Sequence, residues 1–330
     1  MKKIDFLAIG DIAIDAFIKL KDAHIHCNLK KEDCELCFGF GSKVPFESLT
    51  TVPAAGNSSN ASVSASRLGL RSALIVGIGN DKNGKDCINS LKKEKVITKF
   101  IHKEKDKKTN YHFILWYDLD RTILVNRSEF KYEFPKLPKI SWIYLSSIPE
   151  NSKDCYLKII EFLKKNPNTK LAFQPGTFQI KLGAEKLKEI YQNTEIFFSN
   201  LEEAGKILGI KNKDPLILSK GIQTLGPKIV SITDGKNGAY LYYKKELWHI
   251  PAYADPAPQL ERTGAGDAFS STFTSELALG LSPLEAFKRS PINSMSVVQK
   301  IGAQQGLLSK EKLEEYLKNA PENYKVKKIN

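Results

Sequence analysis

Short, almost purely apolar segments alternate along this chain with longer segments of helical periodicity. The segment at residues 4–9 ends at Gly10, and similar runs occupy residues 73–78, 142–145, 171–174, 196–198 and 229–233. Apolar runs of this length are typical of strands that are buried on both faces of a sheet. Because helices are expected between them, the strands form right-handed βαβ units and a mostly parallel sheet with helices on both sides. The alternation predicts an α/β fold.

The helices are expected at residues 57–68, 81–92, 153–164, 201–208, 216–225, 265–279, 283–300 and 310–317, with an edge hairpin of residues 239–243 and 247–250. Two stretches break the alternation: residues 16–52, and residues 103–127, where strands at 111–117 and 122–125 flank a turn. Both leave the main unit and return, so we expect them to form one small antiparallel lid. The predicted domains are a main α/β domain of residues 1–15, 53–102 and 128–330, and a β-strand lid of residues 16–52 and 103–127.

Composition and charge limit the partners of the chain. No apolar run approaches the roughly 18 residues of a membrane span, and residues 1–10 form an expected strand and not a signal peptide. We therefore expect a cytoplasmic protein without a membrane partner. The formal net charge of +13 raises nucleic acid as a partner, but lysine, spread along the chain, supplies nearly all of it. A solvated lysine-rich surface is the preferred interpretation. The alternative, a basic nucleic-acid-binding protein, predicts DNA binding that depends steeply on salt.

The strongest chemical signal is Gly264-Ala265-Gly266-Asp267, which leads directly into an amphipathic helix. The two glycines let the backbone turn tightly and leave its amides open to a ligand. The free N–H groups of a first helical turn form an anion site that suits a phosphate. Asp267 would lie beside that site as the base for a substrate hydroxyl. The alternative is a simple loop with a capping aspartate.

A second segment, Gly56-Asn57-Ser58-Ser59-Asn60, opens the first helix. Its small residues permit a ligand to approach closely. The amides of Asn57 and Asn60 supply donors and acceptors for hydroxyl groups. The alternative is a Ser/Asn-rich helix start without a ligand.

Two further segments follow predicted strands at the carboxyl edge of the sheet, where ligands of open α/β sheets bind. Asn200 and Glu203 come after the strand at 196–198, and Glu203 could hold a water on Mg²⁺. A capped helix start explains the same residues equally well. Thr233, Gly235 and Gly238 lie in a glycine-rich turn that by itself is only a hairpin. No GxxxxGK[ST] segment occurs, which excludes a P-loop enzyme.

Together and in this order, the motifs resemble the PfkB family of carbohydrate kinases over residues 4–308. The resemblance implies a ribokinase-like fold, a three-layer αβα sandwich with a mostly parallel central sheet and a small antiparallel β lid. It also implies an ATP-dependent kinase that phosphorylates a hydroxyl of a sugar or nucleoside and requires Mg²⁺. Acceptor choice depends on lid residues that the sequence alone does not place. A non-catalytic ligand sensor on the same fold is the alternative, although Asp267 and the glycines are intact.

The family's motifs carry roles onto particular positions. Gly264, Ala265 and Gly266 form the implied anion hole and Asp267 is the implied base. The acceptor is held by Asp15, Gly56, Asn57 and Asn60, and ATP by Asn200, Glu203, Thr233, Gly235, Gly238 and Asn293. The turn at Gly302-Ala303 is similar to one that in many members helps to hold a monovalent cation, so K⁺ is an implied cofactor. Two departures are Ala55, where the family has glycine, and Glu261, where it has aspartate; the second puts the K⁺ site in question.

The lid adds two expectations. Antiparallel strands of this kind present an open edge and an apolar face, so we expect a homodimer joined through the lids. The lid also contains His26 and three cysteines, Cys27, Cys34 and Cys37, a pattern that indicates a structural Zn²⁺ site of Cys₃His type. If the segment around Cys27 is a strand, its alternate side chains point to opposite faces and cannot all converge. The alternative is a set of reduced cysteines that act as small hydrophobes, since a disulfide is not expected in such a chain.

Overall fold

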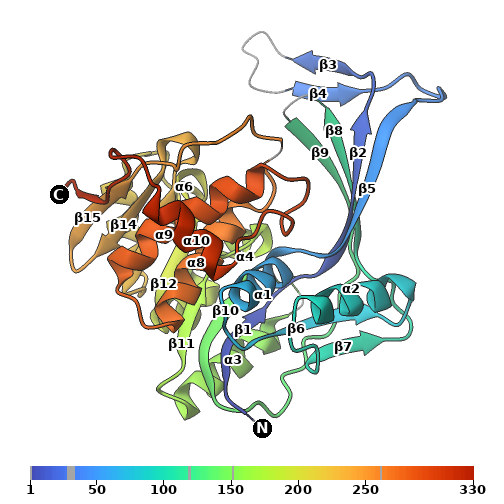
Figure 1. Cartoon of the computed structure of the whole chain (residues 1–330). Coiled ribbons are helices and arrows are strands. Elements are labelled where there is room, and N and C mark those ends of the chain that lie inside the picture. The colour runs from blue at the N-terminus through green and yellow to red at the C-terminus, as the bar shows by residue number, and fades with distance from the viewer. Residues whose placement is uncertain (1, 28–33, 118–119, 151, 261) are drawn as a thin grey trace.

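The computed structural model describes residues 2–27, 34–117, 120–150, 152–260 and 262–330. Its centre is a ten-stranded sheet in the order β16-β15-β14-β13-β12-β11-β10-β1-β6-β7 (Figure 1). The strands from β13 to β7 run parallel, and β14, β15 and β16 extend the sheet as antiparallel neighbours. Their bounds are β1 Ile4–Ile9, β6 Ser72–Gly79, β7 Ile101–Glu104, β10 Ile140–Leu145, β11 Lys170–Phe173, β12 Thr194–Asn200, β13 Ile229–Thr233, β14 Ala239–Tyr243, β15 Glu246–Ile250 and β16 Lys327–Lys328.

Helices cover both faces of this sheet, because its central strands are apolar on both sides. One buried cluster includes residues of α1, α2, α8, α9 and α10, and the other includes residues of α3, α5, α6 and α7. The bounds are α1 Asn57–Arg67, α2 Lys82–Lys93, α3 Lys153–Lys165, α4 Thr177–Leu182, α5 Lys188–Gln192, α6 Leu201–Leu208, α7 Pro215–Thr224, α8 Ala265–Ala278, α9 Pro283–Val298 and α10 Lys310–Lys318. None of the helices in the described residues is long and apolar enough to cross a membrane.

A second, four-stranded sheet rises from one side of this body (Figure 1). Its order is β5-β2-β8-β9, with bounds β2 Ala13–Leu20, β5 Phe46–Ala55, β8 Tyr111–Tyr117 and β9 Asp120–Asn126. The two chain segments that broke the sequence alternation therefore share one sheet. The pairings of β2 with β5 and of β8 with β9 are antiparallel, whereas β2 and β8 run parallel. We call this sheet the lid. Part of the predicted turn, Asp118 and Leu119, lies outside the described residues.

The lid touches the main body through a small apolar cluster of Phe17, Val52 and Ile114, against which Ile301 packs. Its strands extend beyond the predicted lid boundaries, since β2 begins at Ala13 and β5 continues to Ala55. β7, in contrast, pairs with β6 in the main sheet. The division of the chain into two domains at the predicted boundaries stays a prediction.

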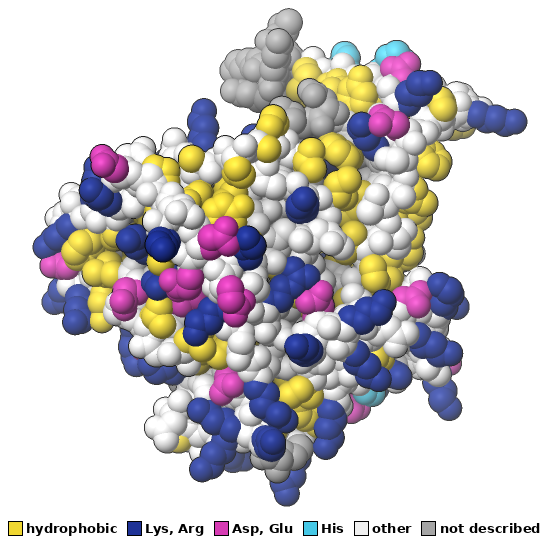
Figure 2. Space-filling view, viewed as in Figure 1, with side chains coloured by type: hydrophobic (Ala, Val, Ile, Leu, Met, Phe, Trp, Pro, Cys, Tyr) yellow, Lys and Arg dark blue, Asp and Glu magenta, His cyan; other side chains and the backbone are white. Residues whose placement is uncertain are grey.

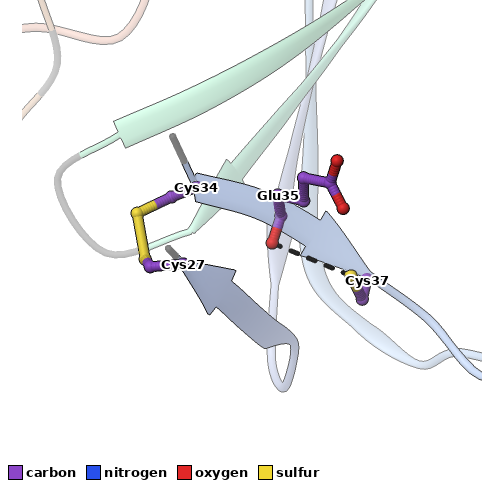
Figure 3. The surroundings of a disulfide bond; sticks show 4 residues. All are labelled: Cys27, Cys34, Glu35 and Cys37. Carbon is purple, nitrogen blue, oxygen red and sulfur yellow. Dashed lines mark hydrogen bonds between the residues drawn. A yellow bond between two sulfur atoms is a disulfide. The ribbon is translucent and has the colours of Figure 1, made fainter. Parts of the chain in front are cut away.

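At the tip of the lid, the short strands β3 His24–Cys27 and β4 Cys34–Cys37 form an antiparallel hairpin that corrects the zinc prediction (Figure 3). The register places Cys27 directly opposite Cys34, and the two form a disulfide bond. Cys37 is an odd number of residues from Cys34, so its side chain points to the other face of the strand. The prediction of a Cys₃His site including His26 is therefore wrong, and so is the expectation of no disulfide. The described residues contain no cluster of three metal-ligating side chains.

Candidate active site

Two segments far apart in the sequence meet where α1 and α8 begin. The side chain of Asn57 donates from Nδ2 to Oδ1 of Asp267 at 2.8 Å. Asn60 donates from its Nδ2 to the other carboxylate oxygen, also at 2.8 Å. The structure thus brings the first and second predicted motifs into one site. Asp267 lies in the first turn of α8, as expected from its position after the glycines.

The backbone before Asp267 has a conformation that requires glycine. Gly264 is the N-cap of α8 with a left-handed backbone, φ 83°. A Cβ atom placed on Gly264 would lie 2.3 Å from the Cβ of Ala303, so the turn at 302–303 packs directly against it. A Cβ on Gly266 would instead have Gln174 Nε2, at 3.8 Å, as its nearest neighbour. The loop is closed on the side of Ala303 and open at Gly266, where the helical N–H groups can receive an anion.

A third amide reaches the base from the main sheet, and the sequence motifs did not indicate it. Gln174 follows β11 and donates from Nε2 to Oδ1 of Asp267 at 3.2 Å. Its Oε1 accepts hydrogen bonds from Ser270 Oγ, at 2.8 Å, and from the Tyr144 hydroxyl. Because an ionised carboxylate only accepts hydrogen bonds, the nitrogen end of the Gln174 amide faces Asp267 and its oxygen end faces the two hydroxyls. Its place just after a parallel strand was the only sequence signal.

The electrostatics of Asp267 follow from this enclosure. The residue is 8% exposed, and burial raises the pKa of its carboxyl above the ordinary value for aspartate. Hydrogen bonds from Asn60, Asn57 and Gln174 act against that shift because they favour the ionised form. The nearby charge of Asp15 raises the pKa further. A base with an elevated pKa and fixed orientation is suited to accept a proton.

Beside the base, where β2 enters the lid, lie two buried aspartates. Asp15 is 9% exposed and its Oδ1 is 3.1 Å from Nδ1 of His112, its neighbour on β8. Asp11 forms an ion pair with Arg127 and accepts from Nδ2 of Asn110 at 2.9 Å. Burial raises the pKa of Asp11, and the charge of Arg127 opposes that shift. Asp15 was predicted; Asp11, Arg127 and His112 were not.

Gly56 closes the same region from the start of α1. Its φ is 105°, and a Cβ there would lie 2.8 Å from the carbonyl oxygen of Asp11. A side chain at this position would therefore force apart the start of α1 and the segment after β1. Glycine at this position therefore permits close approach of two backbone segments, and the predicted approach of a ligand stays a prediction.

The residues predicted to hold ATP have engaged side chains or lie in turns. Asn200 and Glu203 form a reciprocal capping box at the start of α6, with Glu203 N to Asn200 Oδ1 at 2.8 Å and Asn200 N to Glu203 Oε2 at 3.0 Å. Burial raises the pKa of Glu203, and the charge of Asp267 raises it further. Glu203 is half-buried, and a carboxylate near a second negative charge favours a cation, so the residues present fit Mg²⁺ held through a water.

The remaining predicted ATP contacts differ in exposure. Thr233 ends β13, and Gly235 and Gly238, both with positive φ, form the turn into β14. Asn293 is fully buried in α9, where Nδ2 donates to Thr272 Oγ1 at 2.7 Å and Oδ1 accepts from the Leu308 amide at 2.9 Å. Its amide thus joins α9 to α8 and to the segment before α10. Glu261, the departure that bears on K⁺, lies outside the described residues.

Comparison with known proteins shows the family of the chain independently of the site geometry. Residues 19–310 match the description "pfkB family carbohydrate kinase". Ribokinase from Mus musculus is 28% identical over 267 residues, which cover 76% of this chain and 79% of the mouse protein. A nucleoside kinase from Methanocaldococcus jannaschii superposes with a TM-score of 0.78 at 18% identity, over 97% of this chain and 99% of that one. An Escherichia coli structure solved with ATP and Mg²⁺ superposes with a TM-score of 0.76 at 19% identity, over 95% and 99%.

Proposed function

The chain belongs to the pfkB family of carbohydrate kinases, and we propose that it transfers the γ-phosphoryl group of ATP to a hydroxyl of a sugar or nucleoside, with Asp267 as the base. One observation carries the proposal: Asp267 follows the open glycine loop and accepts hydrogen bonds from Asn57 and Asn60, the two asparagines at the start of α1. A base, an anion site and acceptor-binding amides then occupy one place, which phosphoryl transfer needs because it depends on positioning and charge.

In this mechanism, Asp267 accepts the proton of the acceptor hydroxyl as the phosphoryl group arrives, an effect worth about 10²–10⁴ in rate. The backbone amides of Gly264, Ala265 and Gly266 stabilise the charge on the transferring group, at roughly 10²–10³ in rate per lost donor in comparable sites. The lid covers the acceptor and excludes water, which would otherwise take the phosphoryl group.

The proposed binding residues surround this centre. Asp15, Gly56, Asn57 and Asn60 hold the acceptor. ATP lies along the carboxyl edge of the sheet, in contact with Asn200, Glu203, Thr233, Gly235 and Gly238. Asn293 was predicted among these contacts, but it is fully buried with both ends of its amide bonded inside the protein, so it supports α8 and the segment before α10 and does not touch the nucleotide. Glu203 would hold Mg²⁺ through a water, and the ion would neutralise phosphate charge when bound.

An acceptor screen tests the proposal. ADP formation would be followed over sugars, sugar phosphates and nucleosides, and the phosphorylated products identified by mass spectrometry. We expect acceptor-dependent ADP formation with members of at least one class. The sugar named for the mouse relative and the nucleoside named for the archaeal structure are both first candidates. ADP formation that is independent of every acceptor would refute kinase activity of this kind.

We also propose that two copies of the chain join through their lids. Leu49 on β5, Phe113 on β8 and Leu124 on β9 lie on one face of the lid and are 53%, 40% and 51% exposed. Figure 2 shows hydrophobic side chains gathered over the lid. An exposed apolar sheet face of this kind favours a partner surface. Light scattering should give twice the 37.0 kDa chain mass. Leu124→Lys should give a monomer, and Leu157→Lys, equally apolar and exposed on α3, should not.

Two further parts of the proposal concern conditions of action. A monovalent cation such as K⁺ is proposed to bind near Gly302 and Ala303, because that turn packs on the anion loop at Gly264. The test of this cation site compares kinase activity in potassium buffer with kinase activity in a buffer whose only monovalent cation is a large organic one. The cytoplasm is the proposed compartment because the proposed phosphoryl donor is ATP.

A further inference from the structure

One buried amide outside every predicted motif reaches the base through Asn60. Gln304 lies in the turn between α9 and α10 and is 6% exposed. Its Nε2 donates to Oδ1 of Asn60 at 3.0 Å, and to the backbone oxygen of Ala54 at 2.6 Å. Asn60 in turn donates from Nδ2 to Oδ2 of Asp267. The three side chains therefore form a continuous, buried chain of hydrogen bonds that ends on the base.

This chain decides which way the Asn60 amide points. The oxygen and nitrogen ends of an asparagine amide have nearly the same shape, so packing does not choose between them. Only the nitrogen end can donate to Asp267; the oxygen end would place a partial negative charge against a carboxylate. Because Gln304 presents an N–H to Asn60, the Asn60 oxygen faces Gln304 and its nitrogen faces the base. Gln174 likewise presents its nitrogen end to the base, with its oxygen end toward the hydroxyls of Ser270 and Tyr144.

The turn that carries Gln304 also contacts the lid and the anion loop. Ile301 packs against the lid cluster of Phe17, Val52 and Ile114. A Cβ on Gly302 would lie 3.0 Å from Val52, and Ala303 packs against the anion-loop residue Gly264. Residues 301–304 thus contact the lid, the anion loop and the amide at the base in succession.

We propose that Gln304 is a positioning residue for phosphoryl transfer, which holds the Asn60 amide with its nitrogen toward Asp267 and ties that orientation to the turn beneath the lid. The inference rests on the proposed role of Asp267. Gln304 does not touch the reacting atoms in this arrangement; it acts through Asn60.

A purely structural role is the competing explanation, and it makes a different prediction. Ala54 has a left-handed backbone with φ 61°, a conformation that costs a residue with a Cβ roughly 1–2 kcal/mol. The bond from Gln304 to the Ala54 oxygen could serve only to hold this turn. Loss of Gln304 would then lower stability, and its effect would not depend on Asn60.

The test replaces Gln304 by methionine, which keeps the length of the side chain and removes its N–H donors. Gln305→Met is the matched control, because Gln305 is the next residue of the same turn and is exposed. We expect Gln304→Met to lower kcat about tenfold, which is the factor for one buried hydrogen bond, with KM for ATP unchanged. Gln305→Met should leave kcat as it is.

Two additional readouts separate positioning from fold support. In an Asn60→Ala background, Gln304→Met should have no further effect on kcat, since the residue through which it acts is gone. A carbon-13 NMR titration should show a higher pKa of the Asp267 carboxyl in Gln304→Met, because the Asn60 amide is no longer held with its N–H toward the ionised carboxylate. The other titratable groups that act on Asp267 are Asp15 on β2, Glu203 on α6 and Tyr144 on β10, and all stay in place.

The outcomes are distinct. Equal effects of Gln304→Met with and without Asn60, or an unchanged Asp267 pKa, would overturn the positioning role and leave a structural one. The pKa readout does not need turnover, so it supports or overturns the hydrogen-bond chain even if no acceptor is phosphorylated. Absence of kinase activity in the unaltered protein, together with a shifted pKa, would instead refute the proposed function.

Discussion

Replacing Asp267 by asparagine changes one carboxylate oxygen into an amide and leaves the shape of the side chain almost intact. In the parent, Oδ1 accepts from Asn57 and Gln174, and Oδ2 accepts from Asn60. The new side chain can keep its oxygen at the Oδ1 position and thus retain two of the three bonds. Its nitrogen then faces the Nδ2 of Asn60, whose orientation Gln304 fixes. One unmatched donor pair of this kind costs about 1–3 kcal/mol.

The variant cannot accept a proton, so turnover should fall by about 10²–10⁴, which corresponds to about 3–5 kcal/mol in the barrier. ATP binding, measured by calorimetry, should be close to that of the parent, since the Asp267 side chain is not among the proposed nucleotide contacts. Asp106→Asn, at an exposed aspartate, controls for the loss of a negative charge. Near-normal turnover in Asp267→Asn, with normal ATP affinity, would refute the assignment of the base.

The pH dependence of stability gives the same variant a second test. Burial raises the pKa of Asp267 in the folded state, so the folded protein binds more protons than the unfolded chain in that window. Stability of the parent contributed by this group is present below the unfolded pKa and is lost as pH rises through the folded pKa. Asp267→Asn lacks this pH-dependent contribution to the free energy of unfolding. Urea unfolding should show the difference in stability moving in favour of the variant as pH increases, and a pH-independent difference would contradict the burial argument.

The remaining predictions concern the acid limb, the metal and the anion loop. Turnover should decline as pH falls through the pKa of Asp267, which is raised above its ordinary value, and an acid limb at or below the ordinary aspartate pKa would contradict the shift. Glu203→Gln should raise the Mg²⁺ concentration needed for half-maximal activity while keeping the helix cap, because glutamine also forms capping boxes; Glu202→Gln, at the exposed neighbour, should not. Gly264→Ala should lower the free energy of unfolding, measured by chemical denaturation, by about 2 kcal/mol or more, because of its left-handed φ and the contact with Ala303. Gly183 has a similar φ of 87° with open space around it. Gly183→Ala should therefore lower the free energy of unfolding only by the cost of the left-handed backbone, about 1–2 kcal/mol.

Most of the main sheet could be predicted because burial on both faces leaves a direct mark on the sequence. The predicted segments 4–9 and 229–233 coincide with β1 and β13, and 201–208 with α6. β7 was missed because its four residues, Ile101–Glu104, include only one apolar residue and lie at the edge of the sheet. β16 pairs two lysines with β15, and no apolar pattern can indicate such a strand.

The lid was harder, because both of its faces are partly exposed and its strands come from two distant segments. The parallel pairing of β2 with β8 could not be read from either segment alone. The cysteine prediction failed for a related reason. Sequence spacing gave the number of thiols, but the register of β3 on β4, which faces Cys27 with Cys34, decides which of them can meet.

Within the site, the sequence indicated residues that a ligand must meet and missed residues that act on other side chains. Asp267 and the glycines beside it stand in a motif because the chemistry restricts a short, continuous piece of backbone. Gln174 places its own amide against Asp267, which is 93 residues away in the sequence. Gln304 orients the amide of Asn60, which is 244 residues away. Nothing in their local sequence distinguishes them from other glutamines. Three amides, two from the start of α1 and one from just after β11, converge on one carboxylate, so its orientation is a property of the whole fold. Substitutions at Gln304 should therefore change catalysis although no motif contains this residue.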